Sequence, residues 1–207
     1  PAAGMSDKRL KTQDSRLKTI GIFGGSFDPV HSAHVLVARA ALEELSIDRL
    51  FIVPVARSPF KPERQPAPAE ARLRLLRLAF AGCNDCEIDP QEVERDGVSY
   101  SIDTIRHYAG RFPGAKLLYL IGADHVPTLP EWREAADMAK LAEFVVVPRP
   151  GQPVADFPEP FRGQALRGWP FEVSSSAIRE RLCLGQAIDG LVPPAVAESL
   201  QNDNPYT

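Results

Sequence analysis

Long apolar runs are absent from this 207-residue sequence: none approaches the roughly 20 residues that a membrane-spanning helix needs. The N-terminal stretch also lacks the hydrophobic core of a secretory signal. Basic residues are not in surplus, since 24 Lys and Arg stand against 27 Asp and Glu, for a net charge of −3. These absences exclude broad electrostatic binding to nucleic acid or to anionic membranes. They predict a cytoplasmic protein with neither nucleic acid nor membrane as a partner.

Cysteine is scarce as well. Of the three cysteines, Cys83 and Cys86 form a C-x-x-C pair and Cys183 stands far from both. A structural zinc site usually needs four ligands, and a thioredoxin-like motif opens a helix after a strand. The polar segment around Cys83 is instead typical of a turn that leads into a strand. We therefore expect reduced thiols in a loop and no metal site formed by protein side chains.

Two common nucleotide-binding motifs, G-x-x-x-x-G-K-[ST] and G-x-G-x-x-G, are missing. The sequence does contain short apolar runs that alternate with helical stretches. This alternation predicts an α/β fold with a doubly wound, mostly parallel sheet flanked by helices. Residues 1–17 are polar and aperiodic, so we expect a disordered arm or a remnant of expression before Met5. Residues 18–207 are expected to form a single domain.

The hydrophobic pattern predicts where the elements lie. Strands are expected at 18–25, 49–55, 116–123 and 144–149, with short strand segments at 86–89, 92–96 and 171–173. Helices are expected at 32–45, 69–81, 101–110 and 131–142, and from about 175 and 194. Ser32 is placed to cap the first of these helices. The arginines of RLRLLR, residues 72–77, recur at helical spacing and are expected on a solvated face.

The stretch GIFGGSFDPVHSAH, from Gly21 to His34, joins the first strand to the first helix. Gly24 and Gly25 permit positive φ, so that backbone amides can point at one spot. The helix N-terminus favours an anion, and His31 and His34 project from it to the same side. Ligands of open parallel sheets bind beyond the carboxyl ends of the strands. The stretch therefore predicts a polyphosphate cradle, with the protonation of the two histidines left open.

The same residues, GGSFDPVHSAH, resemble the first signature of the nucleotidyltransferase superfamily, and VSSSAIRERL at 173–182 is similar to the second. Three intervening segments resemble bacterial nicotinate-nucleotide adenylyltransferases: PVARSPFKP at 54–62, ERDGVSYSIDT at 94–104 and LIGADHVPTLPEWRE at 120–134. The likeness spans about residues 18–200 and implies a Rossmann-like fold of the nucleotidyltransferase type. It also implies transfer of AMP from ATP to nicotinate mononucleotide in NAD biosynthesis, with deamido-NAD and pyrophosphate as products.

The resemblance implies an ATP site that both signatures build. His31, His34 and Arg179 are the expected catalytic residues, because they can donate to phosphates while charge builds on the leaving pyrophosphate. Further ATP contacts are expected from Gly24, Gly25, Ser26, Gly122, Asp124, Ser174, Ser175 and Ser176. Mg²⁺ is the expected cofactor, held mainly by the ATP phosphates and by water, because the sequence contains no carboxylate cluster.

The resemblance also implies an acceptor site. Trp132 is expected to stack on the nicotinate ring, and Lys61 to neutralise the phosphate of the mononucleotide. The nicotinate carboxylate is expected to meet Ser99, Tyr100 and Ser101. The chain departs from the family pattern at four positions. Ala33 replaces the usual Gly, Ser58 the usual Pro, Phe60 the usual His and Arg133 a frequent aromatic residue.

Other interpretations stay open. A sister adenylyltransferase acting on nicotinamide mononucleotide or phosphopantetheine would share these signatures. A catalytically silent nucleotide sensor would keep the fold, although the two histidines and Arg179 argue against it. A nucleic-acid binder would need a basic face with interleaved aromatic residues. The sequence does not distinguish a monomer from a homodimer.

Overall fold

The computed structural model describes residues 18–60, 63, 65–148, 151, 155–169 and 171–206. Residues 1–17, for which the sequence predicts an arm, and Lys61, predicted at the acceptor phosphate, lie outside these ranges. Within the described residues, no helix is both long and apolar enough to cross a membrane.

A parallel sheet forms the centre of the molecule, and its strands run in the order β3-β2-β1-β4-β5-β6. The strands are β1 (Thr19–Gly25), β2 (Arg49–Pro54), β3 (Cys86–Ile88), β4 (Lys116–Gly122), β5 (Glu143–Val147) and β6 (Gly163–Ala165). From β1 the chain adds strands first toward one edge and then toward the other. This is the doubly wound topology that the alternating pattern predicts, and its switch point lies between β1 and β4.

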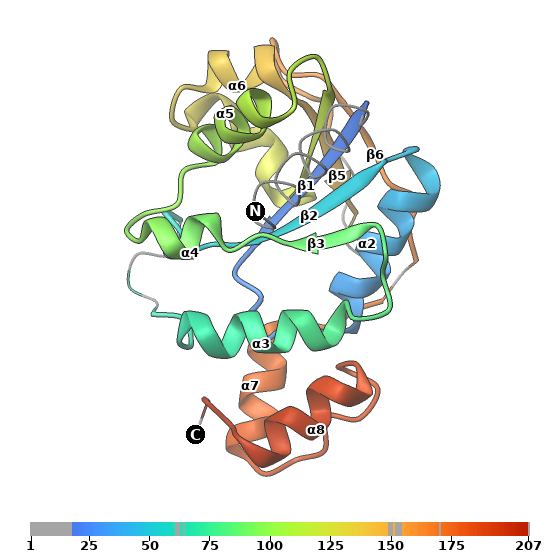
Figure 1. Cartoon of the computed structure of the whole chain (residues 1–207), viewed down its shortest axis with the longest axis vertical. Coiled ribbons are helices and arrows are strands. Elements are labelled where there is room, and N and C mark those ends of the chain that lie inside the picture. The colour runs from blue at the N-terminus through green and yellow to red at the C-terminus, as the bar shows by residue number, and fades with distance from the viewer. Residues whose placement is uncertain are drawn as a thin grey trace, which may run out of the picture.

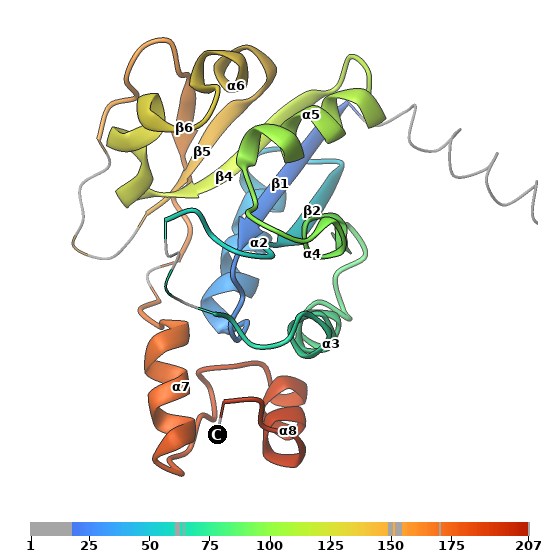
Figure 2. The same ribbon diagram turned by 90° about the vertical axis from the view of Figure 1, so that its left-hand side faces the viewer.

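Helices cover both faces of the sheet (Figures 1 and 2). They are α2 (Ser32–Glu44), α3 (Ala69–Ala79), α4 (Gln91–Arg95), α5 (Ser101–Arg111), the 3₁₀ helix η1 (Ala123–Glu131), α6 (Ala135–Leu141), α7 (Ser175–Cys183) and α8 (Pro194–Asn202). In both views α7 and α8 lie together at one end of the molecule, next to α3.

Two hydrophobic cores result, one on each face of the sheet. Phe23 of β1 packs into the core formed with α2, α3, α7 and α8. Its neighbour Ile22 points the other way, into the core formed with α5, η1 and α6. Because the central strands are buried on both faces, they are continuous apolar runs in the sequence, as is typical of parallel sheets.

Two of the predicted short strands are wrong. Residues 92–95 belong to helix α4 and Asp96 is its C-cap; Glu92 of this helix is buried and accepts a hydrogen bond from the Thr104 hydroxyl. Residues 171–173 form no strand, and the edge strand β6 lies at 163–165 instead. Gly163 permits this pairing, because an added Cβ there would lie only 2.0 Å from the carbonyl oxygen of Phe144. Such tertiary contacts leave no local sequence pattern.

The helix boundaries differ from the prediction at two places. The N-cap of α2 is His31, while the hydroxyl of Ser32 donates to the carbonyl of Gly190 at 3.1 Å. The helix expected over 131–142 begins only at Ala135, because the 3₁₀ helix η1, with two internal prolines, precedes it. The longer predicted helices and strands are confirmed within a few residues at their ends.

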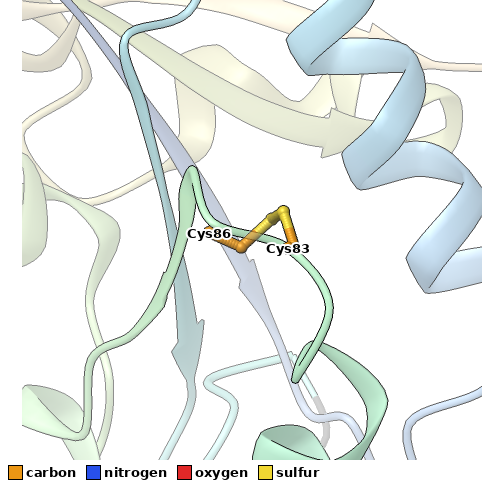
Figure 3. The surroundings of a disulfide bond; sticks show 2 residues. All are labelled: Cys83 and Cys86. Carbon is orange, nitrogen blue, oxygen red and sulfur yellow. A yellow bond between two sulfur atoms is a disulfide. The ribbon is translucent and has the colours of Figure 1, made fainter.

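Cys83 and Cys86 form a disulfide bond (Figure 3), so the expectation of reduced thiols is wrong. The turn after α3 folds back on itself, as the amide of Cys86 donates to the carbonyl of Cys83 at 3.3 Å. The two Cα atoms thereby come within 5.3 Å of each other, inside the usual range for a disulfide. Cys183 is free and exposed.

Reduction of this disulfide is expected to lower the free energy of unfolding by about 1–2 kcal/mol, because the short closed loop restricts few conformations of the unfolded chain. Urea denaturation with and without a phosphine reductant measures the difference. The Cys83→Ser/Cys86→Ser variant should show no response to the reductant, and Cys183→Ser should respond as the wild type does. Equal unfolding midpoints for the oxidised and reduced wild type would contradict the prediction.

Candidate functional site

The turn between β1 and α2 is shaped by close contacts. Its left-handed residue is Phe27, with φ 45°, so the expectation of positive φ at Gly24 and Gly25 is wrong. The two glycines instead leave room for aromatic side chains. An added Cβ would lie 3.0 Å from the Tyr119 hydroxyl oxygen at Gly24 and 3.0 Å from the Phe27 ring at Gly25. Side chains at these positions would therefore displace the turn.

His31 and His34 lie at the start of α2 with their rings stacked, 3.7 Å between centroids and 24° between planes. The backbone N–H of His31 donates to Nδ1 of His34 at 3.1 Å. A neutral His34 therefore carries its proton on Nε2, which makes this atom a hydrogen-bond donor. The His31 side chain lies at the backbone N–H of His34 in a capping-box arrangement, but its buried Nδ1 has no hydrogen bond of normal geometry among the described residues. Such a buried polar atom is costly unless a ligand or water satisfies it.

Burial sets the charge of this pair. It lowers the pKa of His31 from 6.5 to about 4. Burial also lowers the pKa of His34 well below its usual value, and the charge of His31 lowers it further. At neutral pH both rings are therefore uncharged in the ligand-free protein, and each offers one N–H donor. A polyanion bound beside them would shift both pKa values upward.

The second predicted segment folds directly onto this turn. Ser174 caps α7, its hydroxyl accepting from the amide of Ala177 at 3.2 Å. The Ser175 hydroxyl donates to the carbonyl of Pro29 at 2.9 Å. Arg179 donates from Nη1 to the carbonyl of Asp28 at 2.5 Å and from Nη2 to Oγ of Ser176 at 2.8 Å. Arg179 and Ser175 thus contact the turn that leads to the two histidines, although the segments are far apart in sequence.

Arg72 holds the same turn from behind. It is almost fully buried, and its guanidinium donates to the carbonyls of Ala67, Ser26 and Val55 at 2.8–3.0 Å. The expected solvated face is therefore wrong for this arginine. Helical spacing cannot reveal the three carbonyl groups, because the β1–α2 turn and the chain after β2 supply two of them.

Asp28 and Tyr206 complete this support, and neither follows from the sequence pattern. The Asp28 carboxylate is buried, accepts from the amide of Ala67 at 3.0 Å and lies 3.8 Å from Nη1 of Arg179. Burial raises the pKa of the Tyr206 hydroxyl, and the nearby Asp28 carboxylate raises it further. The chain near its last described residue therefore packs against the turn that carries the histidines.

β4 ends beside β1, at the switch point of the sheet. Phe23 pairs with Leu120 in the ladder, and Gly122 follows at the carboxyl end of β4. Gly122 is also the N-cap residue of η1, in which Asp124 occupies the first turn. The structure thus places these two predicted ATP-binding residues at the carboxyl ends of the central strands, where the turn between β1 and α2 also begins.

A pocket of about 340 Å³ lies on the α5 side of the sheet. It is lined by Pro59, Phe60, Tyr100, Ser101, Glu131, Trp132, Arg133 and Met138. The volume is at the lower end of the range for small-molecule sites, and most of the lining is apolar or aromatic. The predicted acceptor residues Tyr100, Ser101 and Trp132 are thus gathered in one place.

Trp132 is held at this pocket by its own loop. Its indole Nε1–H donates to the hydroxyl of Thr128 at 3.3 Å, and its amide donates to the carbonyl of Leu129 at 3.1 Å. The rings of Phe60 and His125 lie 5.3 and 5.6 Å from the indole, between centroids. The Phe60 ring is about half exposed, so this departure from the family pattern adds an accessible aromatic surface.

Ser99 and Ser101 have different positions. Ser99 is buried, and its hydroxyl accepts from the amide of Ala56 at 2.9 Å, so it fastens the chain after β2 rather than lining the pocket. Ser101 lines the pocket, and its hydroxyl accepts from the Tyr119 hydroxyl at 2.9 Å. Tyr119 in turn lies against Gly24. A direct chain of contacts therefore joins the pocket to the β1–α2 turn.

Metal ligation by the protein itself finds no basis in this region. Among the residues that the structure describes, no group of three or more His, Cys, Asp or Glu side chains could hold a metal ion.

Known proteins are similar to this chain over most of its length. The family model for cytidylyltransferase-like proteins matches residues 22–181. A protein of Gemmatimonas aurantiaca, described as a probable nicotinate-nucleotide adenylyltransferase, is 38% identical over 194 residues, covering 90% of this chain and 92% of its own. A protein of Geobacillus kaustophilus with the same description is 39% identical, covering 90% and 85% of the two chains.

A solved structure shares the fold. The nicotinic acid mononucleotide adenylyltransferase of Plasmodium falciparum complexed with NaAD superposes with a TM-score of 0.76, covering 91% of this chain and 97% of its own. At 18% sequence identity, this likeness concerns the fold alone.

Replacement of Arg72 by Met is expected to lower the free energy of unfolding by about 3 kcal/mol, because three carbonyls lose their donor. Urea denaturation measures the change. Arg77→Met, on the exposed side of the same helix, serves as the control and should stay within about 0.5 kcal/mol of wild type. Equal losses for the two variants would show that Arg72 does not anchor the turn.

The buried histidines predict a pH dependence of stability. The pKa of His31 is lowered in the folded protein, so between pH 6.5 and about 4 the unfolded chain binds more protons than the folded chain does. The free energy of unfolding therefore decreases as the pH is lowered through this range. Between pH 7 and pH 5, we expect the free energy of unfolding to fall by about 2 kcal/mol less in His31→Gln than in the wild type.

Urea denaturation at both pH values measures this difference. His107→Gln, which changes an exposed histidine of α5, is the control and should keep the wild-type slope. An unchanged slope in His31→Gln would mean that His31 is not buried as a neutral ring.

Proposed function

Because the chain belongs to the nicotinate-nucleotide adenylyltransferase family, within the cytidylyltransferase-like proteins, we propose that it transfers the adenylyl group of ATP to nicotinate mononucleotide. The products are nicotinate adenine dinucleotide (deamido-NAD) and pyrophosphate, which is a step of NAD biosynthesis. The substrates are two small nucleotides, and the predicted cytoplasmic location belongs to the same proposal.

One observation carries this proposal: Arg179 donates to the carbonyl of Asp28, three residues before His31. This contact supports a single seat for a triphosphate, formed by the N-termini of α2 and α7. The positive end of each helix dipole favours an anion, and Arg179 adds a permanent positive charge. The buried and unpartnered Nδ1 of His31 supports a polar ligand at the same place.

The reaction needs no nucleophile from the protein. A phosphate oxygen of the mononucleotide attacks the α-phosphorus of ATP, the bond from this phosphorus to the β-phosphate oxygen breaks, and pyrophosphate leaves with the electron pair. The protein aligns the two anions and stabilises the charge that builds on the leaving group. We assign His34 to the α-phosphate through its Nε2–H and Arg179 to the β- and γ-phosphates.

The acceptor belongs in the pocket at the N-terminus of α5. The contact from Ser101 through Tyr119 to Gly24 supports this placement, because it sets the acceptor beside the triphosphate seat. Trp132 then stacks on the nicotinate ring, and Tyr100 and Ser101 contact its substituent. Mg²⁺, when bound to the ATP phosphates and water, neutralises part of the triphosphate charge.

Replacement of His34 by Ala is expected to lower kcat by about 100-fold, because the variant loses a donor to the reacting phosphate. The KM for nicotinate mononucleotide should change by no more than about threefold, since the acceptor pocket is untouched. Pyrophosphate release from ATP, Mg²⁺ and the mononucleotide measures both constants.

His107→Ala, which removes an exposed histidine outside both sites, is the control and should retain wild-type rates. Near-normal turnover in His34→Ala would remove this histidine from the mechanism. A wild-type protein that forms product from nicotinamide mononucleotide or phosphopantetheine but not from nicotinate mononucleotide would overturn the choice of acceptor.

A further inference from the structure

The pocket at the start of α5 contains a positive charge that the family pattern does not predict. Arg133 lines the pocket, and its guanidinium carbon lies 4.5 Å above the centroid of the Tyr100 ring. Stacking on an aromatic face holds the planar guanidinium in one orientation at little entropic cost. The charge therefore has a defined place in the pocket wall, although about half of the side chain is exposed to solvent.

Neighbouring carboxylates do not neutralise this arginine closely. The nearest ion-pair contact among the described residues is from Nε to the Glu134 carboxylate at 3.7 Å, which is longer than a hydrogen bond. Glu134 instead accepts from Arg106 at 2.6 Å. The contact with Glu134 uses Nε, whereas the two terminal nitrogens of Arg133 carry most of the donors with which a guanidinium binds a carboxylate.

The rest of the lining makes this charge decisive for the kind of ligand that binds. Glu131 also lines the pocket and by itself disfavours an anion. The helix α5 begins at two of the lining residues, Tyr100 and Ser101, and the positive end of its dipole favours an anion. Without a cation in the wall, the two effects oppose each other. The positive charge of the Arg133 guanidinium makes the pocket favour a ligand with a negatively charged group.

We propose that Arg133 is a specificity-determining residue that selects a pyridine mononucleotide with a ring carboxylate over one with a neutral carboxamide. This inference rests on the proposed function and names the residue that distinguishes the two acceptors. The guanidinium pairs with the carboxylate at the mouth of the pocket while Trp132 contacts the ring. A carboxamide gains no ion pair there, so it competes less well for the same site.

The test compares the two acceptors in the complete protein with ATP and Mg²⁺. We expect Arg133→Gln to lower the ratio of kcat/KM for nicotinate over nicotinamide mononucleotide by about tenfold, a modest factor because solvent screens a half-exposed ion pair. The change should appear as a raised KM for nicotinate mononucleotide. Arg133→Lys, which keeps the charge but not the planar fork, should recover part of the ratio.

Lys140→Gln is the matched control. It also removes one positive charge, from an exposed side chain of α6 that does not line the pocket. It should leave the ratio within about twofold of wild type, as expected for a distant surface charge. High salt should shrink the difference between wild type and Arg133→Gln, because an ion pair is screened and a packing contact is not.

The outcomes distinguish the role of Arg133 from the proposed function as a whole. A wild-type protein that adenylylates nicotinate mononucleotide, with an unchanged acceptor ratio in Arg133→Gln, overturns the inference and leaves the proposed function standing. A ratio that falls equally in Lys140→Gln also overturns it, because a general loss of charge would then explain the effect. A wild-type protein that adenylylates neither pyridine mononucleotide overturns the proposed function itself.

Discussion

The site depends on the contact between the guanidinium of Arg179 and the carbonyl of Asp28. This bond, together with that from Ser175 to Pro29, fixes α7 against the turn that follows β1. Arg72 supports the turn from the opposite side through three carbonyl groups. Hydrogen bonds from charged donors to backbone carbonyls are among the stronger ones in proteins, and here they are partly shielded from water. They hold the start of α7 against the turn that leads into α2.

The histidine pair illustrates how burial prepares such a site. Two imidazoles stacked at 3.7 Å repel each other when both are charged, and burial penalises the charge further. The ligand-free protein therefore keeps them neutral, with the His34 tautomer set by the backbone amide of His31. Under the proposed function, a triphosphate would bring the negative charge that these rings lack, and its binding would then be coupled to the proton affinity of the rings. The donors are in position before the ligand arrives, which lowers the cost of organising the transition state.

The acceptor pocket is joined to this centre by one short path. The Tyr119 hydroxyl donates to Ser101 at the pocket and lies against Gly24 at the β1–α2 turn. Burial raises the pKa of Tyr119, so its hydroxyl keeps the proton that this hydrogen bond uses. Glycine at position 24 is needed for the approach of the ring and not for left-handed backbone. If the two nucleotides bind as proposed, the packing of β1 against β4 would set the spacing between them.

The sequence by itself determined the longer strands and helices, the two signature segments and the polar residues that cluster at the carboxyl ends of β1 and β4. These features depend on hydrophobic periodicity and on local capping and turn chemistry, which act over a few residues. Only the tertiary structure decided that Arg72 is an internal anchor, that Ser99 is buried against the chain after β2, that Cys83 and Cys86 are bonded and that the edge strand lies at Gly163. Each of these depends on atoms from segments that are brought together by folding or by a turn. A pattern along the chain records the residue but not the partner that meets it.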